Sequence, residues 1–204
     1  MIEARLRPDL AIIAANIAPG ARVLDVGCGD GALLAALRDG HGVDARGLEL
    51  DAANVAAAVA RGLSVVQGDA DHDLADYPAA SFDYAILSQT LQTTRAPHLV
   101  LDELLRIGTR AFVSFPNFAH WRVRAALMTT GRMPVTRLLP ERWYDTPNIH
   151  HVTIDDFRDL TRARGIAVEQ AWFLSGDQLR RGMAANLLAE HAVFLLKREW
   201  AMGS

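Results

Sequence analysis

The sequence contains one lysine and one cysteine among 204 residues, and these two shortages exclude several classes of enzyme. The lysine is Lys197, so a dehydrogenase with a Tyr-x-x-x-Lys motif, or an enzyme that forms a Schiff base through lysine, would need a lysine elsewhere in the chain. The cysteine is Cys28, which has no second cysteine for a disulfide within the chain or for a metal site. This use of cysteine agrees with a reducing compartment, and we expect a cytoplasmic protein.

Long hydrophobic runs are also absent, although hydrophobic residues make up 50% of the sequence. A membrane-spanning helix needs about 18 or more apolar residues in succession, and no run approaches that length. The first residues, which include Glu3 and Arg5, lack the basic-then-apolar order of a signal peptide. We therefore expect no membrane association, and we expect a chain of this length to form one domain over residues 1–204.

Positive charge is in slight deficit, because the formal net charge is −3. Broad binding to nucleic acid needs a basic excess, so we expect no nucleic-acid partner. The charges are unevenly distributed along the chain. Residues 39–83 hold nine acidic residues against two arginines, whereas residues 117–151 hold five arginines against two acidic residues. This distribution predicts one acidic face and one basic face.

What the sequence does contain is a glycine-rich loop between a predicted strand and a predicted helix. An apolar run at residues 22–26 fits a buried parallel strand. Three alternate glycines, Gly27, Gly29 and Gly31, follow this run, and a helical pattern begins directly after them. Glycine has no Cβ, so the backbone of such a loop can approach a ligand closely and offer it free N–H groups at the helix start.

Two binding chemistries share this arrangement. Gly27, Gly29 and Ala32 satisfy the G-x-G-x-x-A form of the dinucleotide fingerprint. With Asp25 before it, the same loop looks like G-x-G-x-G, the first motif of class I S-adenosylmethionine (SAM) methyltransferases. The loop alone leaves both ligands open.

The order and spacing of two further segments favour SAM. A strand-like run at residues 46–50 ends near Glu49, about 20 positions after the first glycine, where an acidic side chain can accept hydrogen bonds from both ribose hydroxyls. A third run at residues 63–67 is followed by Asp69 and Ala70, where methyltransferases of this class place an acid and a backbone amide against adenine. Three matches in register favour SAM over a nicotinamide cofactor.

Helical and strand-like patterns alternate along the chain, which predicts a parallel sheet with helices on both faces. A segment rich in aromatics, arginine and proline, at about residues 117–151, interrupts this alternation after the fifth strand and would cover the ligand edge. We therefore expect an α/β, Rossmann-like class I methyltransferase fold with a mostly parallel seven-stranded sheet and an insertion after strand 5. Later strands are expected at residues 82–87, 111–115, 167–173 and 192–196, and helices at residues 6–17, 32–38, 54–61, 97–106, 153–164 and 179–190.

Side chains that follow neighbouring parallel strands can contact one ligand, because those strands end at the same edge of the sheet. Ten residues are expected to bind SAM or S-adenosylhomocysteine (SAH): Asp25, Gly27, Cys28, Gly29, Gly31, Glu49, Leu50, Asp69, Ala70 and Ser88. We interpret Cys28 as a small loop residue rather than a nucleophile, because no base lies near it in sequence. No metal is expected, because His72 on its acidic turn lacks a compact ligand set.

The pattern does not identify a catalytic residue. Residues 88–92 follow the fourth strand but lack the Asn-Pro-Pro-Tyr-type motif with which DNA and protein N-methyltransferases accept a target amine. His120, His150 and His151 have the pKa range of a general base, although a structural histidine is more common. The insertion fits contact with a partner or substrate, because tryptophan and arginine concentrate in binding hot spots, or a lid whose tryptophans pack onto the domain.

Several segments together resemble the MetW family of methionine-biosynthesis proteins. They are residues 22–31, 65–71, 85–92, 114–118 with His120 and Trp121, and 143–150, and the resemblance extends from about Arg22 to Arg198. It implies a class I methyltransferase-type fold and a bacterial role in methionine synthesis alongside MetX, the homoserine O-acyltransferase. It implies no established methyl acceptor.

The leading hypothesis is an accessory protein with a SAM or SAH site that binds MetX and supports or regulates homoserine acylation. The alternative is an active SAM-dependent small-molecule methyltransferase, in which Ser88, Gln89 and the insertion would line the acceptor pocket. A nicotinamide-dependent oxidoreductase is disfavoured by Asp69 and Ala70 and by the missing catalytic lysine. A homodimer has no signature in the sequence and stays open.

Overall fold

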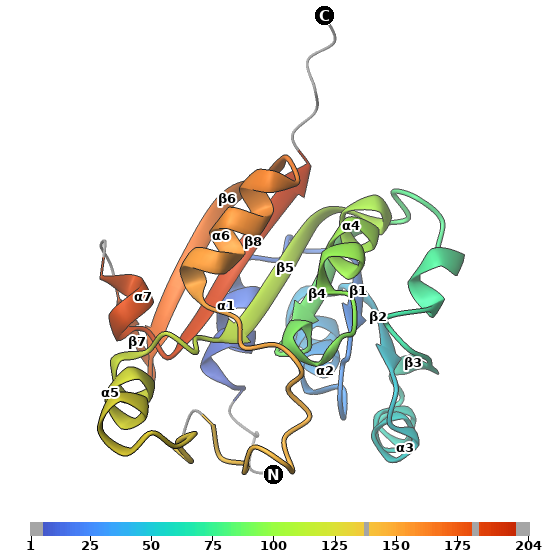
Figure 1. Cartoon of the computed structure of the whole chain (residues 1–204). Coiled ribbons are helices and arrows are strands. Elements are labelled where there is room, and N and C mark those ends of the chain that lie inside the picture. Colours follow the sequence, from blue (N-terminus) through green and yellow to red (C-terminus); the bar gives the residue numbers. More distant parts are fainter. Residues whose placement is uncertain (1–5, 137–138, 181–183, 199–204) are drawn as a thin grey trace, which may run out of the picture.

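The computed structural model describes residues 6–136, 139–180 and 184–198, which build one eight-stranded sheet with helices on both faces (Figure 1). The strands are β1 (Arg22–Val26), β2 (Asp44–Glu49), β3 (Ser64–Gln67), β4 (Phe82–Ser88), β5 (Gly108–Pro116), β6 (Ile166–Ser175), β7 (Gln178–Arg180) and β8 (His191–Arg198). Their order in the sheet is β3-β2-β1-β4-β5-β8-β6-β7. The strands from β1 to β5 pair in parallel, whereas β8 runs antiparallel to β5 and β6, and β7 runs antiparallel to β6.

The helices lie on both faces of this sheet. They are α1 (Pro8–Ala15), α2 (Ala32–His41), α3 (Ala52–Ala60), α4 (Pro97–Ile107), α5 (Trp121–Thr130), α6 (Ile154–Ala163) and α7 (Ala185–Leu188), with short 3-10 turns η1 (Asp73–Asp76) and η2 (Leu91–Thr93). In Figure 1, α4 and α6 lie in front of the sheet, and α1 and α2 lie behind it. The predicted α/β fold is therefore confirmed. Within the described residues, none of the helices has the length and apolar character needed to cross a bilayer.

Each face of the sheet has its own hydrophobic core. On the front, Leu24 of β1 packs in the same cluster as Phe157 of α6, and both are 1% exposed. On the rear, Val23 of β1 packs with Ile13 of α1, and both are fully buried. Consecutive residues of a strand point to opposite faces, so an unbroken apolar run is what a strand covered on both sides requires. Burial of each such side chain contributes about 1.5–3 kcal/mol, which fixes the helices against the sheet.

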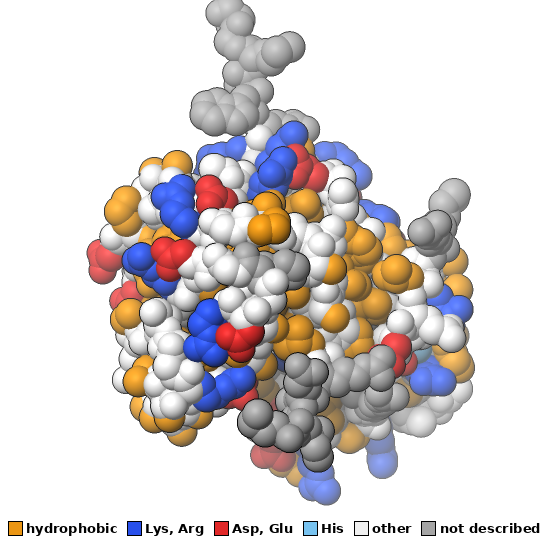
Figure 2. All heavy atoms as spheres, turned by 180° about the vertical axis from the view of Figure 1, so that it is seen from behind, with side chains coloured by type: hydrophobic (Ala, Val, Ile, Leu, Met, Phe, Trp, Pro, Cys, Tyr) orange, Lys and Arg blue, Asp and Glu red, His pale blue; other side chains and the backbone are white. Residues whose placement is uncertain are grey.

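The rear face divides into a hydrophobic half and a charged half (Figure 2). Hydrophobic side chains gather on the side that holds β6 and β8, where Trp172 is partly exposed. In the other half, arginines lie beside acidic side chains. Asp39, Asp44 and Asp83 each form an ion pair with an arginine at 2.8–3.3 Å. Several acidic residues of the 39–83 segment are therefore neutralised by surface arginines.

The sheet has eight strands rather than the seven expected, and the additional strand is β7. It pairs with the end of β6 through a two-residue loop, Gly176-Asp177, in which Gly176 has a φ of +58°. Such a glycine-containing loop between two strands is a hairpin signal. The helix expected at residues 179–190 was therefore wrong over its first part, and the described helix there, α7, has four residues. Residues 181–183 of that expected helix lie outside the described residues.

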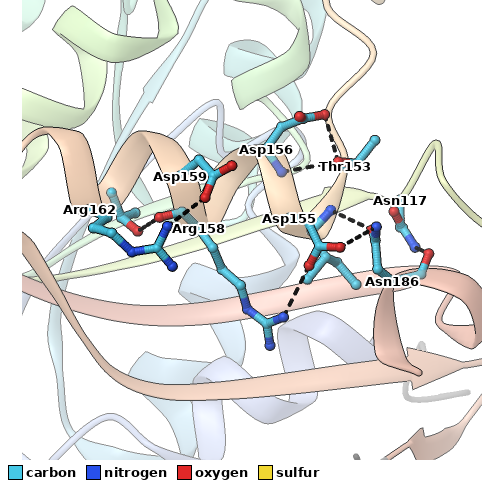
Figure 3. Close-up of polar contacts among 10 residues, drawn as sticks. Asn117, Thr153, Asp155, Asp156, Arg158, Asp159, Arg162 and Asn186 are labelled. Carbon is cyan, nitrogen blue, oxygen red and sulfur yellow. Dashed lines mark hydrogen bonds and ion pairs between the residues drawn. The ribbon is translucent and has the colours of Figure 1, made fainter. Parts of the chain in front are cut away.

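The insertion after β5 runs along the edge where the parallel strands end and contains α5 (Figure 1). Two asparagines hold its ends (Figure 3). Asn117 Nδ2 donates to the carbonyl oxygens of Asn186 at 3.0 Å and Ala189 at 2.8 Å. Asn186 in turn accepts from the Ile154 N–H at 3.2 Å and donates to Asp155 at 2.6 Å. Both ends of the insertion are thereby tied to α7.

Candidate functional site

The glycine loop after β1 has a backbone that glycine adopts without strain. Gly27 and Gly31 have φ angles of +72° and +77°, in the left-handed region. A Cβ on Gly27 would overlap with the Thr90 side chain, and a Cβ on Gly31 would overlap with Leu63. The Gly27 N–H also donates to the Leu48 carbonyl oxygen at 2.7 Å, which ties the loop to β2. Both positions therefore need glycine, for the turn and because side chains of neighbouring segments approach closely.

Two clefts meet at Gly27, which lines both of them. The larger cleft has a volume of about 760 Å³, and the smaller cleft has a volume of about 260 Å³. Of the residues predicted to bind SAM, the larger cleft contains Gly27, Glu49, Leu50, Asp69 and Ala70. The smaller cleft contains Asp25, Gly27, Cys28, Gly29 and Ser88. Gly31 lines neither cleft, so its role in the structure is to let α2 begin close to Leu63.

Glu49, at the end of β2, is 9% exposed and lines the larger cleft. One carboxylate oxygen accepts from the Gly29 N–H at 2.8 Å, and the other accepts from the Asp51 N–H at 2.9 Å. A carboxylate has about four acceptor positions, so each oxygen can accept one further hydrogen bond. The side chain is thus held rigidly at the cleft wall with the capacity to bind a pair of hydroxyls.

Asp69 follows β3 and closes another part of the larger cleft. Its carboxylate accepts from the Asp71 N–H at 2.9 Å and lies 3.1 Å from His72 Nδ1. The bond from the Asp71 N–H, followed by the interaction with His72, holds the pKa of Asp69 below its usual range. Asp69 is therefore an ionised acceptor at this edge. The described residues contain no group of three histidine, cysteine or acidic side chains that could hold a metal ion.

Asp25, in β1, is 2% exposed and lines the smaller cleft. Burial raises its pKa from 3.8 to about 7, an effect that nearby Arg7 partly offsets and that Glu49 and Asp9 strengthen. Its Oδ1 atom is buried and has no hydrogen-bond partner among the described residues. An unpaired buried carboxylate oxygen is costly, so it marks a position where a ligand that donates hydrogen bonds would be stabilised.

A buried polar cluster around Asp9 adjoins the smaller cleft. Asp9 Oδ2 accepts from Ser88 Oγ at 3.0 Å and from Ser114 Oγ at 2.9 Å. Arg7 donates to Ser88 Oγ at 2.9 Å and lies 3.4 Å from Asp9. Gln89, which also donates to Asp9, has a φ of +53°, which is uncommon for a residue other than glycine and often marks a functional site. Ser88 is therefore held by protein groups at the edge of the cleft.

Cys28 and His120 have structural roles in the described chain. Burial, with the nearby charge of Asp25, raises the pKa of Cys28 to about 12, so its thiol stays protonated near neutral pH. His120 is 3% exposed and caps α5, because its Nδ1 accepts from the Arg122 N–H at 3.3 Å. Burial also lowers the pKa of His120. The edge-on packing of His151 against Phe118, with centroids 4.5 Å apart, places that ring in the insertion.

The insertion closes one side of the larger cleft. Pro147 and Ile149 line the cleft together with the strand-end residues. The N–H groups of Ile149 and His150 both donate to the Gln92 carbonyl oxygen, at 2.8 and 3.0 Å. These bonds join the insertion to the segment after β4. The expected position of the insertion over the ligand edge is therefore seen in the structure.

Sequence reasoning missed polar residues in or beside the two clefts that are brought there by contacts between distant segments. Arg7 and Asp9 lie in the N-terminal segment, and Asp9 meets Ser88 and Ser114 across 79 and 105 residues. No local pattern marks such an acid, although an aspartate in the first turn of an otherwise apolar helix was a visible signal. Asp71, which accepts from the Arg95 N–H at 2.9 Å, also lines the larger cleft and was not among the residues expected to bind the ligand.

The residues of the two clefts fit an S-adenosyl compound. In the smaller cleft, the unpaired Asp25 oxygen and the Arg7 guanidinium match the ammonium and carboxylate groups of an amino-acid end. In the larger cleft, Glu49 supplies acceptors for a sugar, and Leu50 and Ala70 supply apolar surface for a base. The two clefts meet at a glycine, where the backbone allows close approach.

Comparison with known proteins identifies a family and a curated relative of this chain. The model of the family described as "Methionine biosynthesis protein MetW" matches residues 7–196. The bifunctional methionine biosynthesis protein MetXA/MetW of Rhodopirellula baltica is 36% identical over 206 residues. The match covers 95% of this chain and 33% of the relative, so the chain spans about a third of the relative's length.

Solved structures with the same fold belong to proteins that are named for different reactions. A SAM-dependent methyltransferase from Mesorhizobium loti has a TM-score of 0.70 at 19% identity, with 94% of this chain and 98% of that chain covered. The [4+2]-cyclase SpnF has a TM-score of 0.67 at 17% identity, with 94% and 81% covered. At these identities the likeness shows the class I methyltransferase fold, and the fold alone does not determine the reaction.

Proposed function

Because the chain belongs to the MetW family, as its motifs predicted, we propose that it is a methionine-biosynthesis accessory protein that binds SAM or SAH and acts with a homoserine O-acyltransferase, MetX. The observation that carries this proposal is the R. baltica relative, whose name joins MetXA and MetW in one bifunctional protein. Linking two modules raises their effective concentration toward each other, which favours components that act together. We propose the same association for this chain.

The cofactor part of the proposal depends on the clefts at the strand ends. Glu49 would hold the ribose hydroxyls, Asp25 the ammonium group and Arg7 the carboxylate group of the ligand. The bound group would supply a methyl sulfonium in SAM and a thioether in SAH. Both share the same nucleoside and amino-acid ends, so these residues would contact either ligand in the same way.

The accessory role extends to regulation. SAM is made from methionine, so a protein that reads SAM can report the level of the end product. A ligand changes the activity of a partner through different affinities for two states, or for the free and bound forms. Pro147 and Ile149 belong to the insertion and line the larger cleft, so a ligand in the cleft would contact the insertion directly.

An acyltransferase assay with and without this chain tests the proposal. The partner from the same organism should co-purify with the chain and should acylate homoserine faster in its presence. Equal rates with and without the chain, and no co-purification, would reject the accessory role. Saturating SAM or SAH should then change the rate or the stability of the complex. If it changes neither, the regulatory part fails while the association stands.

A second candidate is an active small-molecule methyltransferase. Its support is a polar pocket of about 150 Å³ lined by Arg7, Asp9 and Gln89, which shares Arg7 with the smaller cleft. Methyl transfer needs chiefly the positioning of a nucleophile in line with the sulfonium. This pocket could hold the molecule that carries the nucleophile. A screen of metabolites with labelled SAM tests it, and turnover above blank would favour this candidate.

Three further properties belong to the proposal. We propose that residues 1–204 form one domain, that the protein acts in the cytoplasm, and that it uses neither nucleic acid nor a membrane. A homodimer is a further option, and the hydrophobic half of the rear face offers a surface for it (Figure 2). Sedimentation of the purified chain distinguishes a monomer from a dimer.

A further inference from the structure

The exposed part of the insertion has apolar side chains around a pocket. Trp143 is 72% exposed and Met133 is 41% exposed. Together with Phe118 and Leu139 they line a pocket of about 290 Å³, separate from the two clefts at the strand ends. We call Met133, Trp143 and this pocket the insertion patch. Large exposed apolar side chains beside a pocket are typical of a binding surface.

The floor of this pocket is packed. Phe118, Val123 and Leu139 form a buried cluster, each at most 8% exposed. Val123 lies on α5, so the cluster fixes that helix to the rest of the insertion. The insertion ends are held by Asn117 and Asn186, as described above. The pocket is therefore a formed feature that can receive a side chain without first being assembled.

The insertion is positively charged in a protein that is negative overall. Residues 117–151 contain five arginines and two acidic residues, whereas the whole chain has a net charge of −3. Arg142 lies over the Tyr144 ring at 5.9 Å, and Arg122 lies over the Trp121 ring at 5.4 Å. Such arginines keep their charge and present it beside aromatic surface. The surface that complements this one has an apolar centre, with acidic groups toward Arg142 rather than toward Glu141, which lines the pocket.

The insertion patch is connected to the wall of the larger cleft. Trp143 and Pro147 are four positions apart, and Pro147 lines the cleft. The backbone then donates to Gln92 through Ile149 and His150. A macromolecule bound at Trp143 therefore contacts the segment that also contacts the cofactor site. Val59 on α3, by contrast, lines neither of the two clefts.

We infer that the insertion patch is the docking surface for the acyltransferase, which places an apolar side chain in the pocket and acidic side chains toward Arg142. This inference rests on the proposed function, because that function supplies the identity of the occupant. The positive charge of the insertion, its preformed pocket and its continuity with the cofactor cleft supply the location. The affinity of a partner bound at this patch should therefore change when ligand binds in the cleft.

Affinity measurements between purified acyltransferase and variants of the full chain test the location. Trp143→Ala removes the most exposed aromatic ring of the patch, and Met133→Glu places a negative charge there. Val59→Glu is the matched control, because Val59 is 52% exposed on α3, which lies at the opposite end of the sheet from α5 (Figure 1). SAH titration and thermal unfolding of each variant verify that it is folded.

The inference predicts that Trp143→Ala raises the Kd of the complex at least about tenfold, as for a hot-spot residue, and that Val59→Glu changes it less than about twofold. Met133→Glu should behave as Trp143→Ala does, and it replaces that variant if Trp143→Ala fails to fold. If the folded insertion variants bind as the wild type does, or the control loses as much affinity, the location is wrong and the proposed function stands. If the wild type forms no complex, the proposed function itself fails.

Discussion

The cofactor edge and the insertion are stabilised in different ways and present different surfaces. The cofactor edge is built from backbone geometry, with Gly27 in the left-handed region, and from buried carboxyl groups such as Asp25 and Glu49. The insertion is held by the amide of Asn117 at its base and exposes Trp143 at 72%. A preorganised, mostly buried polar site suits a small ligand, whereas an exposed aromatic surface suits a macromolecule. We therefore propose that ligand binding belongs to the cofactor edge and partner binding to the insertion.

Glu49→Ala should separate the two functions most strongly. The loss of two ribose hydrogen bonds to a charged acceptor should weaken SAH binding by roughly 1.5–3 kcal/mol for each bond, or less where water substitutes. The glycine loop also loses the bond from the Gly29 N–H. Docking of the acyltransferase without SAH should be unchanged. Calorimetric titration measures the first effect, and Glu49→Gln, which keeps one acceptor oxygen, should lie between wild type and Glu49→Ala. Wild-type SAH affinity in Glu49→Ala would reject the ribose assignment.

Asn117→Ala should affect partner binding more than SAH binding, the reverse of the result expected for Glu49→Ala. Its amide is buried and donates to two carbonyl oxygens, at 2.8 and 3.0 Å, and each would be left without its donor. An unsatisfied buried group costs about 1–3 kcal/mol, and we expect a loss of unfolding free energy in this range. Denaturant unfolding measures it. The complex with the acyltransferase should weaken more than SAH binding does. Asn54→Ala is the control, because Asn54 is partly exposed on α3. An equal loss of unfolding free energy in that variant would show that Asn117 has no specific role.

The pH dependence of SAH binding should follow Asp25. Its pKa is raised from 3.8 to about 7, so the carboxyl is neutral below that pH and pairs with an ammonium group above it. SAH affinity should rise between pH 6 and 8, by up to about tenfold per unit below the pKa. The raised pKa also means that the stability this group contributes at low pH is lost as the pH rises through about 7. The ligand-free protein should therefore unfold more easily at pH 8 than at pH 6.

Asp25→Asn is the control for this pH dependence. The amide in this variant does not titrate, so SAH affinity and the free energy of unfolding should both depend less on pH. Titrations and thermal unfolding at pH 6 and pH 8 measure the two slopes. Unchanged slopes in the variant would assign the pH dependence to another group.

Cys28→Ala should have the smallest effect. The thiol lines the smaller cleft but is buried and has a pKa raised to about 12, so it contributes packing and no reactive thiolate. SAH affinity should stay within about threefold of wild type, because the loss is limited to small contacts. A titration of the variant measures this. Complete loss of SAH binding would show that Cys28 has a specific role in the cleft.

The sequence predicted the fold and the strand-end residues well because both depend on local patterns. A buried strand, glycines in a tight loop and an acid after the next strand each leave a signature within a few residues. Nine of the ten predicted site residues line one of the two clefts, and Gly31 instead allows the start of α2. Their roles in binding stay predictions.

The features that sequence reasoning missed depend on contacts between distant segments. Asp9 meets Ser114 across 105 residues, and no short pattern encodes that meeting. Strand β7 was missed because its three residues are stabilised by pairing with the end of β6 rather than by their own pattern. The hydrogen bond from Asn117 to α7 could not be predicted from the sequence either, because an asparagine side chain in a loop usually bonds to backbone groups close to it in sequence.

Titration of SAH into the chain alone and into its complex with the acyltransferase measures whether the cleft and the insertion are coupled. We predict saturable binding in both cases and two different dissociation constants, because ligand in the cleft would contact the segment that carries the partner. By linkage, the ratio of those constants should equal the change that SAH makes in the affinity of the partner. Absence of saturable SAH binding in both titrations would contradict the account.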